Sequence, residues 1–125
     1  MAVRRHQFAF EETTNILLSE GFPTKTVLCA NDRIAFGVIA AAFQNGIKVG
    51  HGSGFNIRVA GHDNHPLSRY ACPPITTVAQ NYNDIGRVAI ELLLEKLGNT
   101  GNRQANKAVS DRALLRSDLM LRQSA

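Results

Sequence analysis

Two clusters of polar residues in this 125-residue chain carry side chains that could bind a small polar molecule. The first cluster, Asn31-Asp32, follows the apolar run TVLCA directly, and the second, His62-Asp63-Asn64, follows IRVAG. A carboxylate can accept hydrogen bonds from two hydroxyl groups at once, and an amide side chain both donates and accepts them. Because Asn and Asp are also common in turns and caps, one cluster alone does not distinguish a binding site from a turn.

The apolar runs before these clusters are typical of short buried strands. Strands are expected over residues 26–30, 57–61 and 76–80, and helices over 8–20, 34–44 and 83–97. A short helical turn is expected at 67–71, a loop over 98–105, and one or two strands within 107–122. This alternation predicts an α/β fold with a mostly parallel sheet flanked by helices. Ligands of such sheets bind beyond the carboxyl ends of the strands, where both clusters lie, so the pattern indicates a site for a polar small molecule.

Patterns for catalysis or metal binding are weak. The glycine-rich stretch 50–54 precedes a predicted strand rather than a helix and lacks the Lys-Ser/Thr ending of a phosphate-binding loop. A Ser-His-Asp arrangement fails because His62 and Asp63, adjacent at a strand end, point to opposite sides. Neither Cys29 nor Cys72 has a Cys or His at metal-ligand spacing. We therefore expect no enzyme, no catalytic residue, no metal and no cofactor.

Length and charge limit the other classes of function. The chain has room for one domain, and its net charge of +4 comes from 14 Lys and Arg against 10 Asp and Glu. These charges are scattered, which favours a solvated surface over a nucleic-acid interface. The longest apolar run, residues 34–43, is too short to cross a membrane. The N-terminus lacks the apolar region of a signal peptide, so the expected compartment is the cytoplasm.

Several stretches resemble the effector-binding region of the LacI/GalR family of bacterial transcriptional repressors. They are TVLCANDRIAFG (26–37), IRVAGHDN (57–64) and PPITTVAQNYNDIGRVAIELLLEKL (73–97), followed by LMLRQS (119–124), which is similar to the family's closing Leu-x-x-Arg-x-Ser. The stretches cover nearly the whole chain in the family's order and spacing. The Asn-Asp and Pro-Pro-x-Thr-Thr stretches are each fairly specific, and their combination strengthens the resemblance.

The resemblance implies part of a type I periplasmic-binding-protein-like fold, in which an effector binds between two lobes joined by a three-segment hinge. Residues 1–79 would form an incomplete C-terminal lobe, residues 80–108 the hinge and a helix of the N-terminal lobe, and residues 109–125 a C-terminal return segment. The family's helix-turn-helix has no counterpart here. The chain would thus be the C-terminal fragment of a ligand-responsive transcriptional regulator, reaching DNA only through a missing N-terminal domain.

Site residues carry over from the family's motifs by position. The resemblance implies that Asn31 hydrogen-bonds ligand hydroxyls, that Asp63 accepts hydrogen bonds from them, and that Gln80 and Tyr82 line the cleft. Tyr82 would stack on the apolar face of a sugar or base, whereas Asp32 is expected to cap the following helix. The effector could be a sugar, a nucleoside or a purine.

The family also dimerises through this lobe, and Phe36, Leu67 and Tyr70 match its interface positions. We expect a homo-oligomer, most simply a dimer, with weak or no effector binding by this chain alone. A sugar-binding receptor of a transport system with the same fold is the alternative reading, and a small α/β enzyme is a less favoured one.

Overall fold

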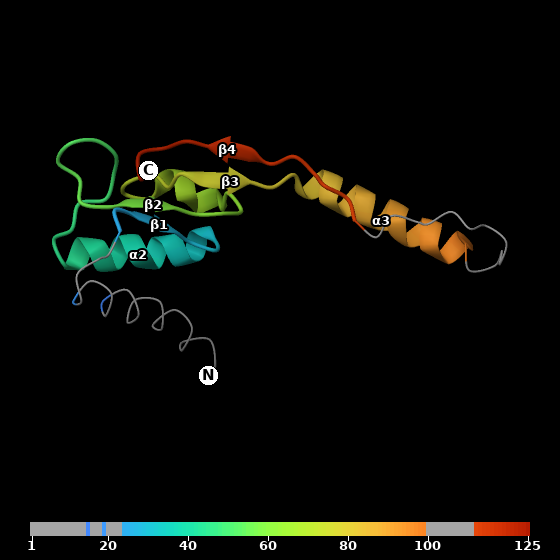
Figure 1. Ribbon diagram of the computed structural model, residues 1–125, viewed down its shortest axis with the longest axis horizontal. Helices are drawn as coiled ribbons and strands as arrows, with labels where there is room; N and C mark the ends of the chain where they lie inside the picture. The colour runs from blue at the N-terminus through green and yellow to red at the C-terminus, as the bar shows by residue number, and fades with distance from the viewer. Residues whose placement is uncertain (1–14, 16–18, 20–23, 100–111) are drawn as a thin grey trace. The chain divides into compact units, whose positions relative to one another are not determined.

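The computed structural model describes residues 15, 19, 24–99 and 112–125, in which strands and helices alternate (Figure 1). The strands are β1 (Thr26–Leu28), β2 (Arg58–Ala60), β3 (Thr77–Ala79) and β4 (Asp118–Met120). The helices are α2 (Asp32–Gln44), the 3-10 helix η1 (Pro66–Tyr70) and α3 (Tyr82–Asn99). The helix expected over residues 8–20 lies outside the described residues, except for Asn15 and Ser19, which are helical.

The strands confirm the predicted parallel arrangement. Strands β1 and β2 pair in parallel, with Val27 opposite Val59. A parallel bridge between Ala60 and Thr76 brings β3 alongside β2, and β4 pairs with β3 in the antiparallel direction. The carboxyl ends of β1, β2 and β3 therefore lie at one edge, which is the edge that carries both polar clusters.

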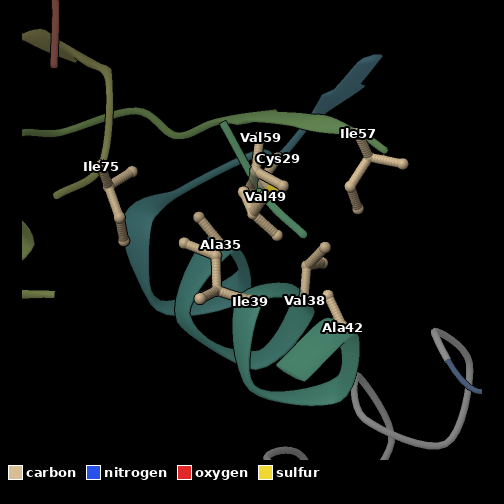
Figure 2. Close-up of a cluster of buried hydrophobic side chains, with 9 residues drawn as sticks. All are labelled: Cys29, Ala35, Val38, Ile39, Ala42, Val49, Ile57, Val59 and Ile75. Atoms are coloured by element: carbon tan, nitrogen blue, oxygen red, sulfur yellow. The ribbon is translucent and has the colours of Figure 1, made fainter. Parts of the chain in front are cut away.

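The core lies between α2 and the strands. Residues Ala35, Val38, Ile39 and Ala42 recur at helical spacing and point from α2 toward the strand side in Figure 2. The other core members are Cys29, Val49, Ile57, Val59 and Ile75. Val59 and Ile75 are completely buried, which suits β-branched residues in and beside short strands. Burial of this apolar surface stabilises the fold by about 25 cal/mol per Å².

The start of α2 differs from the sequence-based expectation. Asn31 has an extended backbone (φ −156°), and its Oδ1 accepts a hydrogen bond from the Ile34 N–H at 2.9 Å. Asn31 is therefore the N-cap, because the side-chain oxygen of a capping residue satisfies an N–H of the first turn. The expectation that Asp32 caps this helix is wrong, since Asp32 is its first residue and is completely buried.

Other element boundaries shift by a few residues. Strands β1 and β2 each span three residues where five were expected, and α2 begins two residues before the expected start at residue 34. The expected helical turn at 67–71 is η1, displaced by one residue. Of the expected strand segment 107–122, the described part contains β4 as its strand. These shifts leave the order of elements as predicted.

The chain divides into two compact units, and each is described by itself. One unit contains Met1–Ala79 and Asp118–Ala125, and the other contains Gln80–Ser117. The first unit contains all four strands, α2 and η1. The second contains α3, whose apolar residues Ile90, Leu93 and Leu94 are exposed. Within the described part of the chain, no helix is both long and apolar enough to span a membrane.

Candidate functional site

Two loops meet at the carboxyl edge of the parallel strands. Asn31 stands at the end of the loop after β1, and Asp63 stands in the loop after β2. The Cys29 N–H donates to the Ala60 carbonyl at 2.8 Å, and the Asp32 N–H donates to the His62 carbonyl at 2.9 Å. These bonds continue the pairing of β1 with β2 beyond the strands. They bring the two polar clusters of the sequence to neighbouring positions, as the sheet prediction requires.

The loop after β2 has an unusual backbone at the second cluster. Asp63 and Asn64 both have positive φ angles, +89° and +48°, in the left-handed region that side-chain-bearing residues seldom adopt. The Asp63 N–H donates to the Val78 carbonyl at 2.9 Å, and the Asn64 N–H donates to the Thr77 hydroxyl at 3.3 Å. The Asp63 carboxyl group thus stands on a backbone fixed to β3, with its Oδ1 atom buried.

The carboxylate of Asp32 connects this loop to the rest of the sheet. Its Oδ1 accepts a hydrogen bond from the Thr77 hydroxyl at 2.6 Å, and its Oδ2 accepts one from the His65 N–H at 2.7 Å. A side chain on Gly61 would collide with the same carboxylate, so the backbone of β2 can approach it only at a glycine. Its place in the first turn of α2 also suits a negative charge. Asp32 therefore serves the fold of the site.

The neighbouring thiol of Cys29 responds to this environment. Burial and, to a smaller extent, the charge of Asp32 together raise the pKa of Cys29 from its ordinary value of 9.0 to about 11. Such a thiol is poorly nucleophilic at neutral pH. Cys29 is accordingly a core residue, as its place in an apolar run suggested.

Two polar residues of the C-terminal segment, Ser124 and Arg122, make hydrogen bonds to the segments around the site. The buried Ser124 hydroxyl donates to the Val59 carbonyl at 2.6 Å and accepts a hydrogen bond from the Thr76 N–H at 2.8 Å. The Arg122 guanidinium reaches Asn64, Ser68 and Ile75. Both polar residues belong to the closing Leu-x-x-Arg-x-Ser motif, in which the sequence alone assigned them no role. That motif was the signal in the sequence that could have pointed to Arg122 and Ser124.

The other two expected site residues belong to the second unit. Gln80 is half-buried, and Tyr82 is 60% exposed at the first turn of α3. The Tyr82 N–H donates to the Gln80 carbonyl at 3.1 Å, so these residues are held next to each other. The structure therefore places the four expected residues in two pairs, Asn31 with Asp63 and Gln80 with Tyr82.

Two of the three expected interface residues are exposed on η1. Leu67 is 58% exposed and Tyr70 is 75% exposed. Phe36 is half-buried, packs against the core and meets the His65 ring edge-on with centroids 6.1 Å apart. The His65 side chain in turn accepts a hydrogen bond from the Leu67 N–H at 3.2 Å. Among the residues that the structure describes, no three His, Cys, Asp or Glu side chains gather as metal ligands.

Comparisons with known proteins agree with this architecture. Residues 2–125 match the family model described as a periplasmic binding protein-like domain. Over 105 residues the chain is 35% identical to the HTH-type transcriptional repressor PurR of Glaesserella parasuis, covering 84% of this chain and 29% of the repressor.

Two solved structures are also similar. The lac repressor dimer bound to operator and the anti-inducer ONPF superposes with a TM-score of 0.77 and 28% identity, over 94% of this chain and 37% of that one. A LacI family transcriptional regulator from Arthrobacter sp. FB24 in complex with lactose gives 0.72 and 30% identity, over 94% of this chain and 41% of that one.

The chain therefore belongs to the periplasmic binding protein-like domain family. Within it, the repressors that it matches confirm the resemblance to the LacI/GalR regulators and the expected partial type I fold. These relatives are transcriptional repressors rather than enzymes. The chain spans less than a third of the length of the curated relatives that it matches, 29% of one and 23% of another.

Proposed function

We propose that this chain is the effector-sensing and dimerising part of a ligand-responsive transcriptional regulator of the LacI type. The observation that carries the proposal is the edge formed by Asn31 and Asp63, where a carboxyl group stands on a left-handed backbone fixed to β3. Strand ends of parallel sheets are where α/β folds bind ligands. The repressors that the chain resembles supply the context of transcriptional regulation.

The chemistry of the proposed site suits a small polar ligand that carries hydroxyl or ring N–H groups. The Asp63 carboxylate would accept hydrogen bonds from such donors, and the Asn31 amide would donate to a ligand oxygen or nitrogen while its Oδ1 caps α2. Gln80 and Tyr82 would complete the site, with the Tyr82 ring stacked on the ligand's apolar face. Sugars, nucleosides and purines all fit this description.

In this proposal the two units belong to two lobes of a larger effector-binding domain. Met1–Ala79 with Asp118–Ala125 would be part of the C-terminal lobe, and Gln80–Ser117 would belong to the N-terminal lobe. An effector that binds one arrangement of the lobes more tightly shifts the population toward that arrangement. In the full regulator this shift would change the affinity of a separate DNA-binding domain for its operator.

Dimerisation is proposed to use the surface formed by Phe36, Leu67 and Tyr70. Exposed aromatic and aliphatic side chains such as Leu67 and Tyr70 are well suited to an interface core. A regulator of this kind would act in the cytoplasm. Sedimentation of this chain should show a dimer, which Tyr70→Asp should dissociate because it puts a charge at the contact. A strictly monomeric wild-type profile would refute the assignment.

The effector proposal is tested by titrating isotope-labelled chain with a panel of sugars, nucleosides and purines while recording amide chemical shifts. Nuclear magnetic resonance detects the weak binding expected of this chain alone. At least one class should shift the amides of Asn31 and Asp63, and Asp63→Asn should abolish the shifts because it removes the charged acceptor.

The matched control is Asp118→Asn, which removes an exposed carboxylate from β4 of the same unit. It should leave the titration unchanged. If no member of the panel shifts the amides of Asn31 and Asp63, the site is wrongly assigned. Shifts of equal size in wild type and Asp63→Asn would likewise exclude Asp63 as a ligand-binding residue.

A further inference from the structure

Arg122 makes an unusually complete set of hydrogen bonds for a half-buried arginine. Its Nη1 donates to the Ser68 hydroxyl at 3.0 Å and to the Ile75 carbonyl at 2.8 Å, and its Nη2 donates to the Asn64 side-chain oxygen at 2.8 Å. Its backbone N–H donates to the Thr76 hydroxyl at 2.9 Å. All of these partners are neutral. The planar fork of a guanidinium fits three such acceptors at once, whereas an ammonium group cannot span them.

These acceptors lie around the loop that carries Asp63. Asn64 follows Asp63 and shares its positive φ, while the hydroxyl of Ser68 donates to the His65 carbonyl at 2.6 Å farther along the loop. Arg122 therefore holds this segment at two points, at Asn64 in the left-handed turn and at Ser68 in the middle of η1. A left-handed backbone at a residue other than glycine persists only where its surroundings determine it. The hydrogen bond from Arg122 to the Asn64 side chain is one of the contacts that hold this backbone conformation.

The same arginine fixes the return of the chain. It follows β4 by two residues, and β4 begins where the chain enters the first unit at Asp118. The Thr76 hydroxyl bonds both the N–H and the carbonyl of Arg122, at 2.9 and 3.2 Å. The backbone of Arg122 is thus fixed to Thr76, and its side chain joins the return segment to the loop of the candidate site.

We propose that Arg122 is a positioning residue of the effector site: it holds the Asp63–Asn64 turn in the left-handed conformation that aims the Asp63 carboxylate, and it ties that turn to the return segment. The inference rests on the proposed function for its consequence on binding. Its conformational part concerns the ligand-free chain and stands on the geometry of Arg122 alone.

The test uses Arg122→Lys and Arg122→Met in the full chain, with Arg58→Met as the matched control because Arg58 is an exposed arginine of the same unit. The first readout is the intraresidue HN–Hα Overhauser effect at Asp63 and Asn64 without ligand, which is strong only when φ is positive. Both Arg122 variants should weaken it at Asn64, and Arg58→Met should not. A purely stabilising role would lower the unfolding midpoint but leave this signal intact.

The second readout is affinity for the panel compound that wild type binds best. Arg122→Lys should lower it about tenfold, because hydrogen bonds made by a charged fork are lost although the charge remains. Unchanged Overhauser effects in both variants, or affinities within about twofold of wild type, would overturn the proposal. If wild type binds no panel compound, the proposed function fails, and the ligand-free signal still decides the role of Arg122.

A second variant covers the case in which the Arg122 variants do not fold. Asn64→Gly removes the acceptor of Nη2, keeps the bonds of Arg122 to Ser68 and Ile75, and tolerates a positive φ. It should fold, should broaden or shift the amide of Asp63, and should weaken effector binding. Wild-type affinity together with an unchanged Asp63 amide would show that the Arg122–Asn64 bond does not position the carboxylate.

Discussion

The two strand ends of the site contain the same two residue types in opposite order, Asn31-Asp32 after β1 and Asp63-Asn64 after β2. At the first end the amide caps α2, and the acid turns inward to bond Thr77 and the backbone of His65. At the second end both residues are left-handed, and the amide oxygen is held by Arg122. Backbone conformation, more than residue type, distinguishes the two carboxylates: Asp32 serves the fold, and Asp63 is the one proposed to bind a ligand.

The difference follows from the segment that comes next in the chain. An α-helix starts directly after Asn31, so its unsatisfied N–H groups take the amide oxygen and leave the next side chain at the buried first turn. At the second end the chain turns through the two left-handed residues Asp63 and Asn64 toward η1. Replacing each acid and each amide in turn therefore separates the contributions of the two ends.

The largest effect is expected for Asp32→Ala. The substitution leaves the buried Thr77 hydroxyl and the part-buried His65 N–H without their acceptor, and it should lower the free energy of unfolding by about 3 kcal/mol. Asp63→Ala should cost less, about 1 kcal/mol, which is the typical loss for a single substitution. Urea unfolding followed by circular dichroism measures both. Equal losses at the two acids would contradict the division of roles.

Gly61→Ala should have the next largest effect, because Gly61 allows the strand ends after β1 and β2 to approach each other closely. The added methyl group would overlap the Asp32 carboxylate, and displacing that group should cost about 2 kcal/mol. The matched control is Gly86→Ala in α3, where the new methyl meets nothing within 4 Å. That variant should gain about 0.5 kcal/mol from helix propensity. A neutral Gly61→Ala would mean that the contact with Asp32 is loose.

The sequence predicted the order of elements and the position of the clusters because both depend on local patterns. Apolar residues at helical spacing define α2, and short β-branched runs between polar clusters define the strands. Capping was predicted at the right place but assigned to Asp32, since Asn and Asp are equally good N-caps. Only the three-dimensional neighbours of the two residues decide between them.

The long-range contacts of the site could not be predicted from one sequence. Asp32 bonds Thr77, 45 positions away, and Arg122 bonds Asn64, 58 positions away. No periodicity or spacing rule connects such pairs, because they meet only after the sheet has formed. The motif that closes the chain marked Arg122 and Ser124 as notable without revealing their partners. The roles proposed for Gln80 and Tyr82 likewise remain predictions from the family resemblance.

Asn31→Ala should have a smaller effect than either change at Asp32 or Gly61. Loss of the cap should cost about 1 kcal/mol, whereas Asn31→Asp keeps a capping oxygen and should stay within a few tenths of wild type. Urea unfolding gives both values. Asn31→Asp should nevertheless weaken effector binding, because the amide donor is lost. Equal stability of Asn31→Ala and Asn31→Asp would show that the cap contributes nothing.

The smallest effect is expected from the ionisation of Cys29, beside the first strand end. Its pKa rises to about 11 in the folded chain because of burial and then the charge of Asp32, against 9.0 for an ordinary thiol. A raised folded pKa means that the thiol's contribution is complete below pH 9 and is lost as pH rises toward 11. Relative to Cys29→Ala, wild type should lose less than about 1 kcal/mol by pH 9, with further loss above it. Unfolding curves at stepwise higher pH measure this difference. Parallel pH profiles for wild type and Cys29→Ala would show that ionisation of the Cys29 thiol does not affect stability. The strand end after β2 has no such thiol. The loss of stability at alkaline pH should therefore disappear in Cys29→Ala and persist in Asp63→Ala.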